Sequence, residues 1–249
     1  VLYRERRAHE RAQTKEQQAP AAPALHVTDN GQRVVLDSQK LQQLIIESCA
    51  GLSADVRPEP ILAETMRNLY DGVPMDEVYK AAILATRTLI EKDPDYTYAT
   101  ARLLMHTITK EVLGQEVAHA SDMARHYAEF FPVAIQKGVD NQLLDDRLLQ
   151  FDLQRLGQAL KPERDLKFDY LGLQTLYDRY FLHVRKTRIE LPQTFFMRVA
   201  MGLALNEIDR EARAIEFYEV LSSFDFMSST PTLFNSGTLR SQLSSCYLT

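Results

Sequence analysis

Apolar residues recur at spacings of three and four along most of this chain, and this pattern restricts its fold more than any other feature. The clearest stretch, "DSQKLQQLIIESCAGL", offers Asp37 or Ser38 as a helix N-cap. Its apolar residues at helical spacing are Leu41, Leu44, Ile45, Cys49 and Leu52. Similar patterns predict helices over 57–70, 75–92, 95–113 and 210–224. The chain is therefore predicted to be mainly α-helical.

One short region has β-strand character. In "LHVTDNGQRVVLD", two β-prone runs flank Asn30 and Gly31, a dipeptide that tolerates the positive φ angles of a tight hairpin turn. The hairpin and about four following helices, the last ended by Gly114 as a C-cap, predict a compact unit over 25–115. The predicted fold class is therefore α+β, mainly α with a small β cap.

Composition marks a boundary before this unit. Residues 1–11 are charged and rich in helix formers, which predicts the end of a solvated helix. The stretch "APAAPAL" predicts a semi-rigid linker over 12–24. Because the chain begins without methionine, inside a helical pattern, we expect it to be part of a longer protein.

The helical pattern continues over 116–224. Pro132 is expected to kink or divide an amphipathic helix in "EVAHASDMARHYAEFFPVAIQKG". "NQLLDDRLLQFDLQRLGQAL" repeats leucine at helical spacing, and Pro192 opens a further helix in "LPQTFFMRVAMGLALNE". The last part, 225–249, contains the loop-like run "STPTLFNSGT".

Charge and hydropathy exclude several classes of protein. The formal net charge of -5 argues against general nucleic-acid binding, because phosphate affinity needs a basic face. No apolar run approaches the roughly 18 residues of a membrane span, and the first residues lack the apolar core of a signal peptide. The two cysteines lie far apart and suggest neither a disulfide framework nor a metal site. We expect a cytoplasmic protein with no membrane or nucleic-acid partner.

Cys246 has two possible roles on the residues alone. A free cysteine is commonly a small buried hydrophobic residue, whereas a reactive one needs a partner thiol or an activating base. Neither is visible in the sequence around it, although the hydroxyls of "STPTLFNSGT" would suit a phosphate-bearing ligand. Cys49 is expected in the core, and Tyr170, Tyr177 and Tyr180 are expected to pack.

Two long stretches carry a specific resemblance. "SSTPTLFNSGTLRSQLSSCYL" and, upstream, "LYDRYFLHVRKTRIELPQTFFMRVAMGLA" resemble the large, catalytic α subunit of class I ribonucleotide reductases. The resemblance covers essentially the whole chain. It implies a helical domain over 116–224, followed over 225–249 by the start of a ten-stranded α/β barrel whose first strand carries the "SSC" sequence.

The resemblance also implies roles for single residues. Thr230 matches a hydroxyl residue that helps to hold the substrate diphosphate, and Ser245 matches a second substrate-contacting residue. Cys246 matches one member of the redox pair that reduces the ribose 2′ carbon, and also contacts substrate. The partner thiol, the thiyl cysteine and the catalytic glutamate and asparagine are expected beyond Thr249, so this chain alone is expected to be inactive.

The implied partners belong to the parent enzyme. They are a ribonucleoside diphosphate substrate, a small β subunit whose metal site supplies the radical, thioredoxin or glutaredoxin, and further copies of the large subunit. ATP and dATP are the implied allosteric effectors. No cofactor or metal is expected to be held by this chain itself.

The unit over 25–115 resembles the ATP-cone, a regulatory domain of that family. The usual Lys-Arg before the Asp-Gly of the opening is missing from "TDNG", while Lys40 remains nine residues after Gly31. Tyr79 stands where a histidine is common, and Lys110 is followed by Glu111. We therefore expect a degenerate second cone with Lys40 as a vestigial effector residue. Residues 1–11 would end a preceding cone that binds ATP or dATP.

Three alternatives stay open. Lys40 and Lys110 could still support nucleotide binding. The chain could be a stand-alone nucleotide-sensing module, although it lacks the four-cysteine zinc ribbon and basic charge of such a regulator. It could also be a helical interaction module without chemistry, in which Cys246 is inert.

Overall fold

The computed structural model describes residues 25–29, 31–114 and 122–246 of the chain. We refer to 25–114 as the N-terminal unit and to 122–246 as the helical region. The predicted preceding helix over 1–11 and linker over 12–24 lie outside the described residues. Among the described helices, none combines the length and the apolar character needed to cross a lipid bilayer.

The N-terminal unit combines a small sheet with four helices. Its strands are β1 (His26–Asp29), β2 (Gln32–Val35) and β3 (Val73–Pro74). Its helices are α2 (Ser38–Cys49), α3 (Pro58–Arg67), α4 (Met75–Thr88) and α5 (Tyr96–Leu113). The predicted hairpin is confirmed, since β1 pairs with β2 antiparallel. The sequence did not reveal β3, a two-residue strand that pairs with β1 in parallel.

Local signals set the helix ends in this unit. The Asp37 side chain accepts a hydrogen bond from Lys40 N at 2.9 Å, which caps the first turn of α2. Gly114 ends α5 with φ 70°, the left-handed conformation that glycine adopts at little cost. Leu41, Ile45 and Cys49 are buried along one face of α2, as the spacing predicts.

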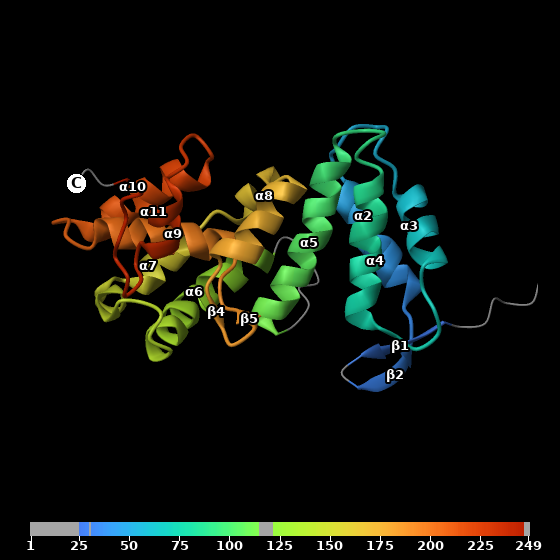
Figure 1. The fold of residues 1–249 in the computed structure, drawn as a ribbon, viewed down its shortest axis with the longest axis horizontal. Coiled ribbons are helices and arrows are strands. Elements are labelled where there is room, and N and C mark those ends of the chain that lie inside the picture. Colours follow the sequence, from blue (N-terminus) through green and yellow to red (C-terminus); the bar gives the residue numbers. More distant parts are fainter. Residues whose placement is uncertain (1–24, 30, 115–121, 247–249) are drawn as a thin grey trace, which may run out of the picture.

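The helical region contains longer helices and several short turns. Its helices are α6 (Met123–Asp140), α7 (Leu153–Gln158), α8 (Tyr170–Thr175), α9 (Pro192–Ala204), α10 (Arg210–Ser222) and α11 (Thr230–Asn235). Its further elements are the 3-10 turns η2 (Asp146–Gln150) and η3 (Pro162–Lys167), the π-helical turn η4 (Leu176–Tyr180), and the paired strands β4 (His183–Val184) and β5 (Thr187–Arg188). Figure 1 shows α2–α5 at one end of the molecule and α9–α11 at the other, and α5 contacts α8 between them.

Pro132 does not divide the predicted helix, because α6 runs through it. Proline cannot donate a hydrogen bond to the carbonyl of residue 128. Helix α7 approaches closely at this point: a Cβ added to Gly157 would lie 3.0 Å from Ala128 O. The helix therefore continues past Pro132 without the hydrogen bond to Ala128 O, at a point where α6 and α7 are tightly packed.

Two expectations about secondary structure need correction. The leucine repeat over 141–160 forms η2 and α7 rather than one helix, because Asp145 and Asp152 each accept a backbone hydrogen bond that starts a new turn. The run "TPTLFN" was expected as a loop but forms α11, which has proline in its first turn.

Candidate functional site

Thr230, the predicted diphosphate contact, is the first residue of α11 and is exposed. Its Oγ1 lies 3.2 Å from the Tyr180 hydroxyl, close enough for a hydrogen bond. The Tyr180 ring stacks on Phe234 of α11, with ring centroids 4.5 Å apart. Tyr180 thus packs, as expected, but it also orients Thr230, a role that the sequence did not reveal.

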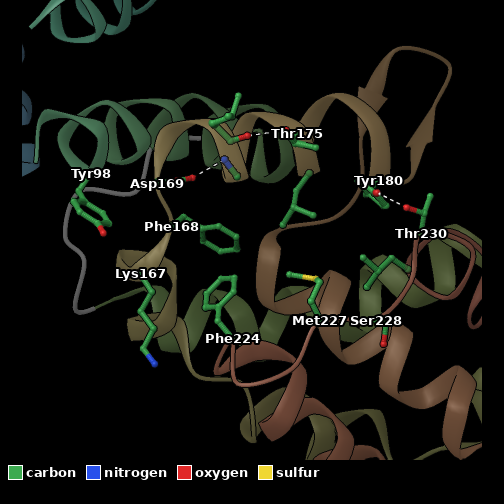
Figure 2. Close-up of a pocket in the computed structure, with 14 residues that line it drawn as sticks. Tyr98, Lys167, Phe168, Asp169, Thr175, Tyr180, Phe224, Met227, Ser228 and Thr230 are labelled. Carbon is green, nitrogen blue, oxygen red and sulfur yellow. Dashed lines mark hydrogen bonds between the residues drawn. The ribbon is translucent and has the colours of Figure 1, made fainter. Parts of the chain in front are cut away.

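A cavity of about 630 Å³ adjoins Thr230. In Figure 2, Thr230 and Ser228 lie on one side of it and Lys167 on the other, with Phe168 and Phe224 between. These phenyl rings meet edge to face, with centroids 4.9 Å apart. The cavity is therefore mainly apolar, and at its margin Ser228, Thr230 and Lys167 offer donors to an anionic group, with the Asp169 carboxylate also in the lining.

Ser245 and Cys246 are exposed and do not line this cavity. Within the described residues 239–246 no strand is formed, so the expected barrel strand stays a prediction. Two hydrogen bonds connect the preceding segment to α11: Thr232 Oγ1 donates to Leu243 O at 3.3 Å, and Asn235 Nδ2 donates to Gln242 O at 2.6 Å. The structure thus attaches the segment before Cys246 to the helix that carries Thr230.

Arg198 fixes the far end of α11 and was not singled out from the sequence. Its guanidinium is fully buried, and Nε donates to Glu190 Oε1 at 2.7 Å. The same group donates to Leu233 O at 3.3 Å and to Ser236 O at 2.8 Å. The signal was present in the sequence, because an arginine in the apolar run "TFFMRVAMGLA" must find an anionic or carbonyl partner when it is buried.

Two glycines allow α11 to lie against α9. A Cβ added to Gly202 would lie 2.0 Å from Gly237 N, so the backbones are in direct contact there. Gly237 has φ 77°, and a Cβ on it would lie 2.9 Å from Arg198 O. Ser236 Oγ also donates to Val199 O at 2.7 Å. The position of α11, and with it that of Thr230, is therefore set by the interior of the helical region.

A buried polar chain lies between α6, η3, α9 and α10. Tyr127 Oη and Gln193 Nε2 donate to the two carboxylate oxygens of Asp165, both at 2.7 Å, and Tyr218 Oη donates to Gln193 Oε1 at 2.7 Å. Asp165 as a whole is only partly buried, but its carboxylate is enclosed. This burial raises its pKa to about 7, although the two hydrogen bonds favour the charged form.

The predicted effector residues of the N-terminal unit are not brought together. A cavity of about 830 Å³ between this unit and the helical region is lined by Asp29, Asp76, Tyr79 and Lys110, but not by Lys40. Lys110 Nζ lies 5.1 Å from the centre of the Tyr79 ring and 3.8 Å from Asp76 Oδ1. Its charge is therefore already partly balanced.

Cys49 is buried, as predicted, and burial raises the pKa of its thiol, which disfavours a reactive thiolate. Over the described part of the chain, no group of three or more His, Cys, Asp or Glu side chains is arranged to hold a metal ion.

Comparison with known proteins places this arrangement in a family. Residues 166–241, which include α8–α11, match the model of the ribonucleotide reductase all-alpha domain. The whole chain aligns at 40% identity over 253 positions with the ribonucleoside-diphosphate reductase subunit alpha of Chlamydia trachomatis, covering 24% of that protein.

Similar proteins occur in distant organisms. The chain is 37% identical to the alpha subunit of Helicobacter pylori and 33% identical to the large subunit of Danio rerio. These alignments cover 89% and 88% of the chain and 27% of each relative. The chain thus spans about a quarter of the length of the relatives it matches, and it belongs to the ribonucleotide reductase large-subunit family.

Proposed function

We propose that the chain is part of a ribonucleoside-diphosphate reductase large subunit that converts ribonucleoside diphosphates to deoxyribonucleotides. One observation carries this proposal: Thr230 and the residues that fix its helix, Tyr180, Arg198 and Ser236, all lie within the segment that matches the reductase all-alpha domain. The Thr230 hydroxyl would donate a hydrogen bond to an oxygen of the substrate diphosphate.

Cys246 supplies one thiol of the reducing pair in this proposal. After a thiyl radical takes the 3′ hydrogen, the 2′ hydroxyl leaves as water with a proton from the pair, and return of the 3′ hydrogen at the end of the turnover re-forms the thiyl radical. Two thiols together give two electrons and two protons, so the 2′ carbon is reduced and one disulfide forms. The second thiol and the thiyl cysteine belong to parts of the parent enzyme outside this chain, and Ser245 would contact the substrate.

The partners follow from this chemistry. A metal-containing small β subunit would supply the radical, and thioredoxin or glutaredoxin would reduce the disulfide after each turnover. Self-association of the large subunit, controlled by ATP or dATP at a preceding cone, would regulate the enzyme.

We further propose that the N-terminal unit is an ATP-cone that no longer binds nucleotide. Asp29, Asp76 and Glu111 line the cavity between this unit and the helical region beside Lys80, Lys110 and Lys186, so the cavity offers a triphosphate no excess of positive charge. Isothermal titration of the chain with ATP and dATP is expected to show no binding at micromolar concentrations. Saturable micromolar binding would overturn this part of the proposal.

Substitution of Thr230 tests the substrate role. In the full-length enzyme with its small subunit, Thr230→Ala is expected to lower kcat/KM by roughly 10- to 150-fold, mostly through KM, because a hydrogen bond to a charged phosphate contributes about 1.5–3 kcal/mol. Thr230→Ser, which keeps the hydroxyl, should recover most of the loss.

The matched control is Thr88→Ala. The Thr88 hydroxyl donates to Ala85 O within its own helix in the N-terminal unit, so its removal should leave kcat/KM near the wild-type value. A Thr230→Ala enzyme with wild-type KM for the diphosphate would argue against the proposed contact.

A further inference from the structure

The N-terminal unit and the helical region meet along α5, and few polar contacts join them. At one end of α5, the backbone N–H of Tyr170 donates to Thr97 Oγ1 at 3.1 Å. The Arg87 guanidinium lies 5.7 Å from the centre of the Tyr170 ring. Near the other end of α5, Glu111 makes two shorter hydrogen bonds to the helical region.

Both carboxylate oxygens of Glu111 accept hydrogen bonds from the helical region. Tyr177 Oη donates to Oε2 at 2.6 Å, and Arg188 N donates to Oε1 at 2.8 Å. All three residues are half-buried, where hydrogen bonds to a charged acceptor are about twice as strong as neutral ones. Burial and the neighbouring Glu111 carboxylate raise the pKa of Tyr177 to about 12, so its hydroxyl remains a donor at neutral pH.

The two residues of the helical region that bond to Glu111 also contact each other. The Arg188 guanidinium lies 4.2 Å from the centre of the Tyr177 ring, and its Nε donates to Tyr177 O at 3.2 Å. Tyr177 belongs to η4 and Arg188 to β5, so two separate elements present donors to one side chain. Glu111 is thus bonded at both oxygens, from two elements, in a partly buried position.

We propose that Glu111 is an interdomain anchor that holds the N-terminal unit in a fixed position on the helical region. The same carboxylate lines the cavity between the two units, beside Lys80, Lys110 and Lys186. The anchor therefore makes this unit a static part of the large subunit, whereas a sensor must move or change its contacts on binding. This docking role is independent of the proposed catalytic function and of whether the cavity binds nucleotide.

Site-resolved hydrogen exchange of the full chain tests the anchor. In Glu111→Ala, the amides of Arg188 and Tyr170 should both exchange about tenfold faster or more, because loss of the anchor opens the contact at both ends of α5. In Tyr177→Phe, the same two amides should accelerate to a smaller extent. The double variant should exchange no faster than Glu111→Ala, because the two groups act as one unit.

Glu77→Ala is the control, since the exposed Glu77 pairs with Lys80 within α4 and should leave both amides unchanged. Faster exchange at Arg188 with no change at Tyr170 would mean a purely local contact and would overturn the proposal. If Glu111→Ala does not fold, as judged by circular dichroism, Tyr177→Phe decides the question. Unchanged exchange at Tyr170 in that variant would also overturn the anchor.

Discussion

The two halves of the molecule satisfy their buried polar groups in different ways. In the N-terminal unit, the buried hydroxyls of Ser48, Thr65, Thr86 and Thr100 each donate to a carbonyl three or four residues earlier in the same helix. In the helical region, buried ionic and amide groups join residues from different elements, as Arg198 joins Glu190 to the end of α11.

This difference has a consequence for function. A hydroxyl bonded within its own helix fixes nothing about how that helix is placed, whereas a buried guanidinium shared by two segments determines their relative position. The helical region therefore holds α11 and Thr230 in place by a buried ion pair. In the N-terminal unit, a guanidinium also joins two helices, because Arg102 donates to Ser48 O and Ala50 O, but these contacts lie at a partly exposed margin. Substitutions that remove polar groups should accordingly have unequal effects in the two halves.

The largest effect is expected at Arg198. Arg198→Met leaves the Glu190 carboxylate buried without a cation and should lower the free energy of unfolding by about 3–5 kcal/mol in urea denaturation. Arg213→Met is the control, because Arg213 pairs with Glu216 on the surface of one helix and should change stability by less than about 0.5 kcal/mol.

A second variant separates the charge from the packing at this site. Arg198→Met combined with Glu190→Leu removes both charges and should regain part of the lost stability. If Arg198→Met were as mild as Arg213→Met, buried polar contacts would not position α11.

A smaller effect, dependent on pH, is expected at Asp165. Its pKa is about 7 when folded, against a reference value of 3.8, so the folded state keeps a proton that the unfolded state loses between these values. The contribution of Asp165 to the free energy of unfolding is therefore highest below pH 4. It falls by up to a few kcal/mol as the pH rises to 7.

Asp165→Asn should remove this fall. The measurement is the free energy of unfolding of the variant and of the wild type, each at pH 5 and at pH 8. The control is Asp178→Asn, an exposed carboxylate hydrogen-bonded to Gln174, which should not alter the slope. An unchanged slope in Asp165→Asn would show that the buried chain of hydrogen bonds does not carry a titrating proton.

The smallest effect is expected in the N-terminal unit. Thr65→Val replaces a hydroxyl that bonds only to Ile61 O in its own helix with a methyl group of similar size. Urea denaturation should show a loss of about 1 kcal/mol or less. A loss as large as that of Arg198→Met would remove the contrast between the two halves.

Much of this fold follows from local sequence signals. The helical spacing around Leu41 and Ile45, the Asn30-Gly31 turn and Gly114 identified the hairpin, α2 and the end of α5 because each signal acts within a few residues. The two-residue strand β3 and the break between η2 and α7 were missed, since they depend on distant pairing or on a single capping aspartate.

The candidate site was predictable only in part. Thr230, Ser245 and Cys246 were predicted as site residues because they match positions of the family that the sequence resembles. The groups that position Thr230 could not be found by spacing, because Tyr180, Glu190 and Arg198 act on α11 across separations of up to 50 residues. An arginine in an apolar helix was the one visible sign of that network.

The redox role of Cys246 gives the most direct test of the account. In the full-length large subunit with its small subunit, Cys246→Ser should abolish thioredoxin-dependent turnover, while Cys49→Ala, which alters a buried thiol of the N-terminal unit, should retain it. In the wild-type enzyme, oxidation should also protect Cys246 from alkylation, because its thiol enters a disulfide. A Cys246→Ser enzyme with normal thioredoxin-dependent turnover would contradict the account.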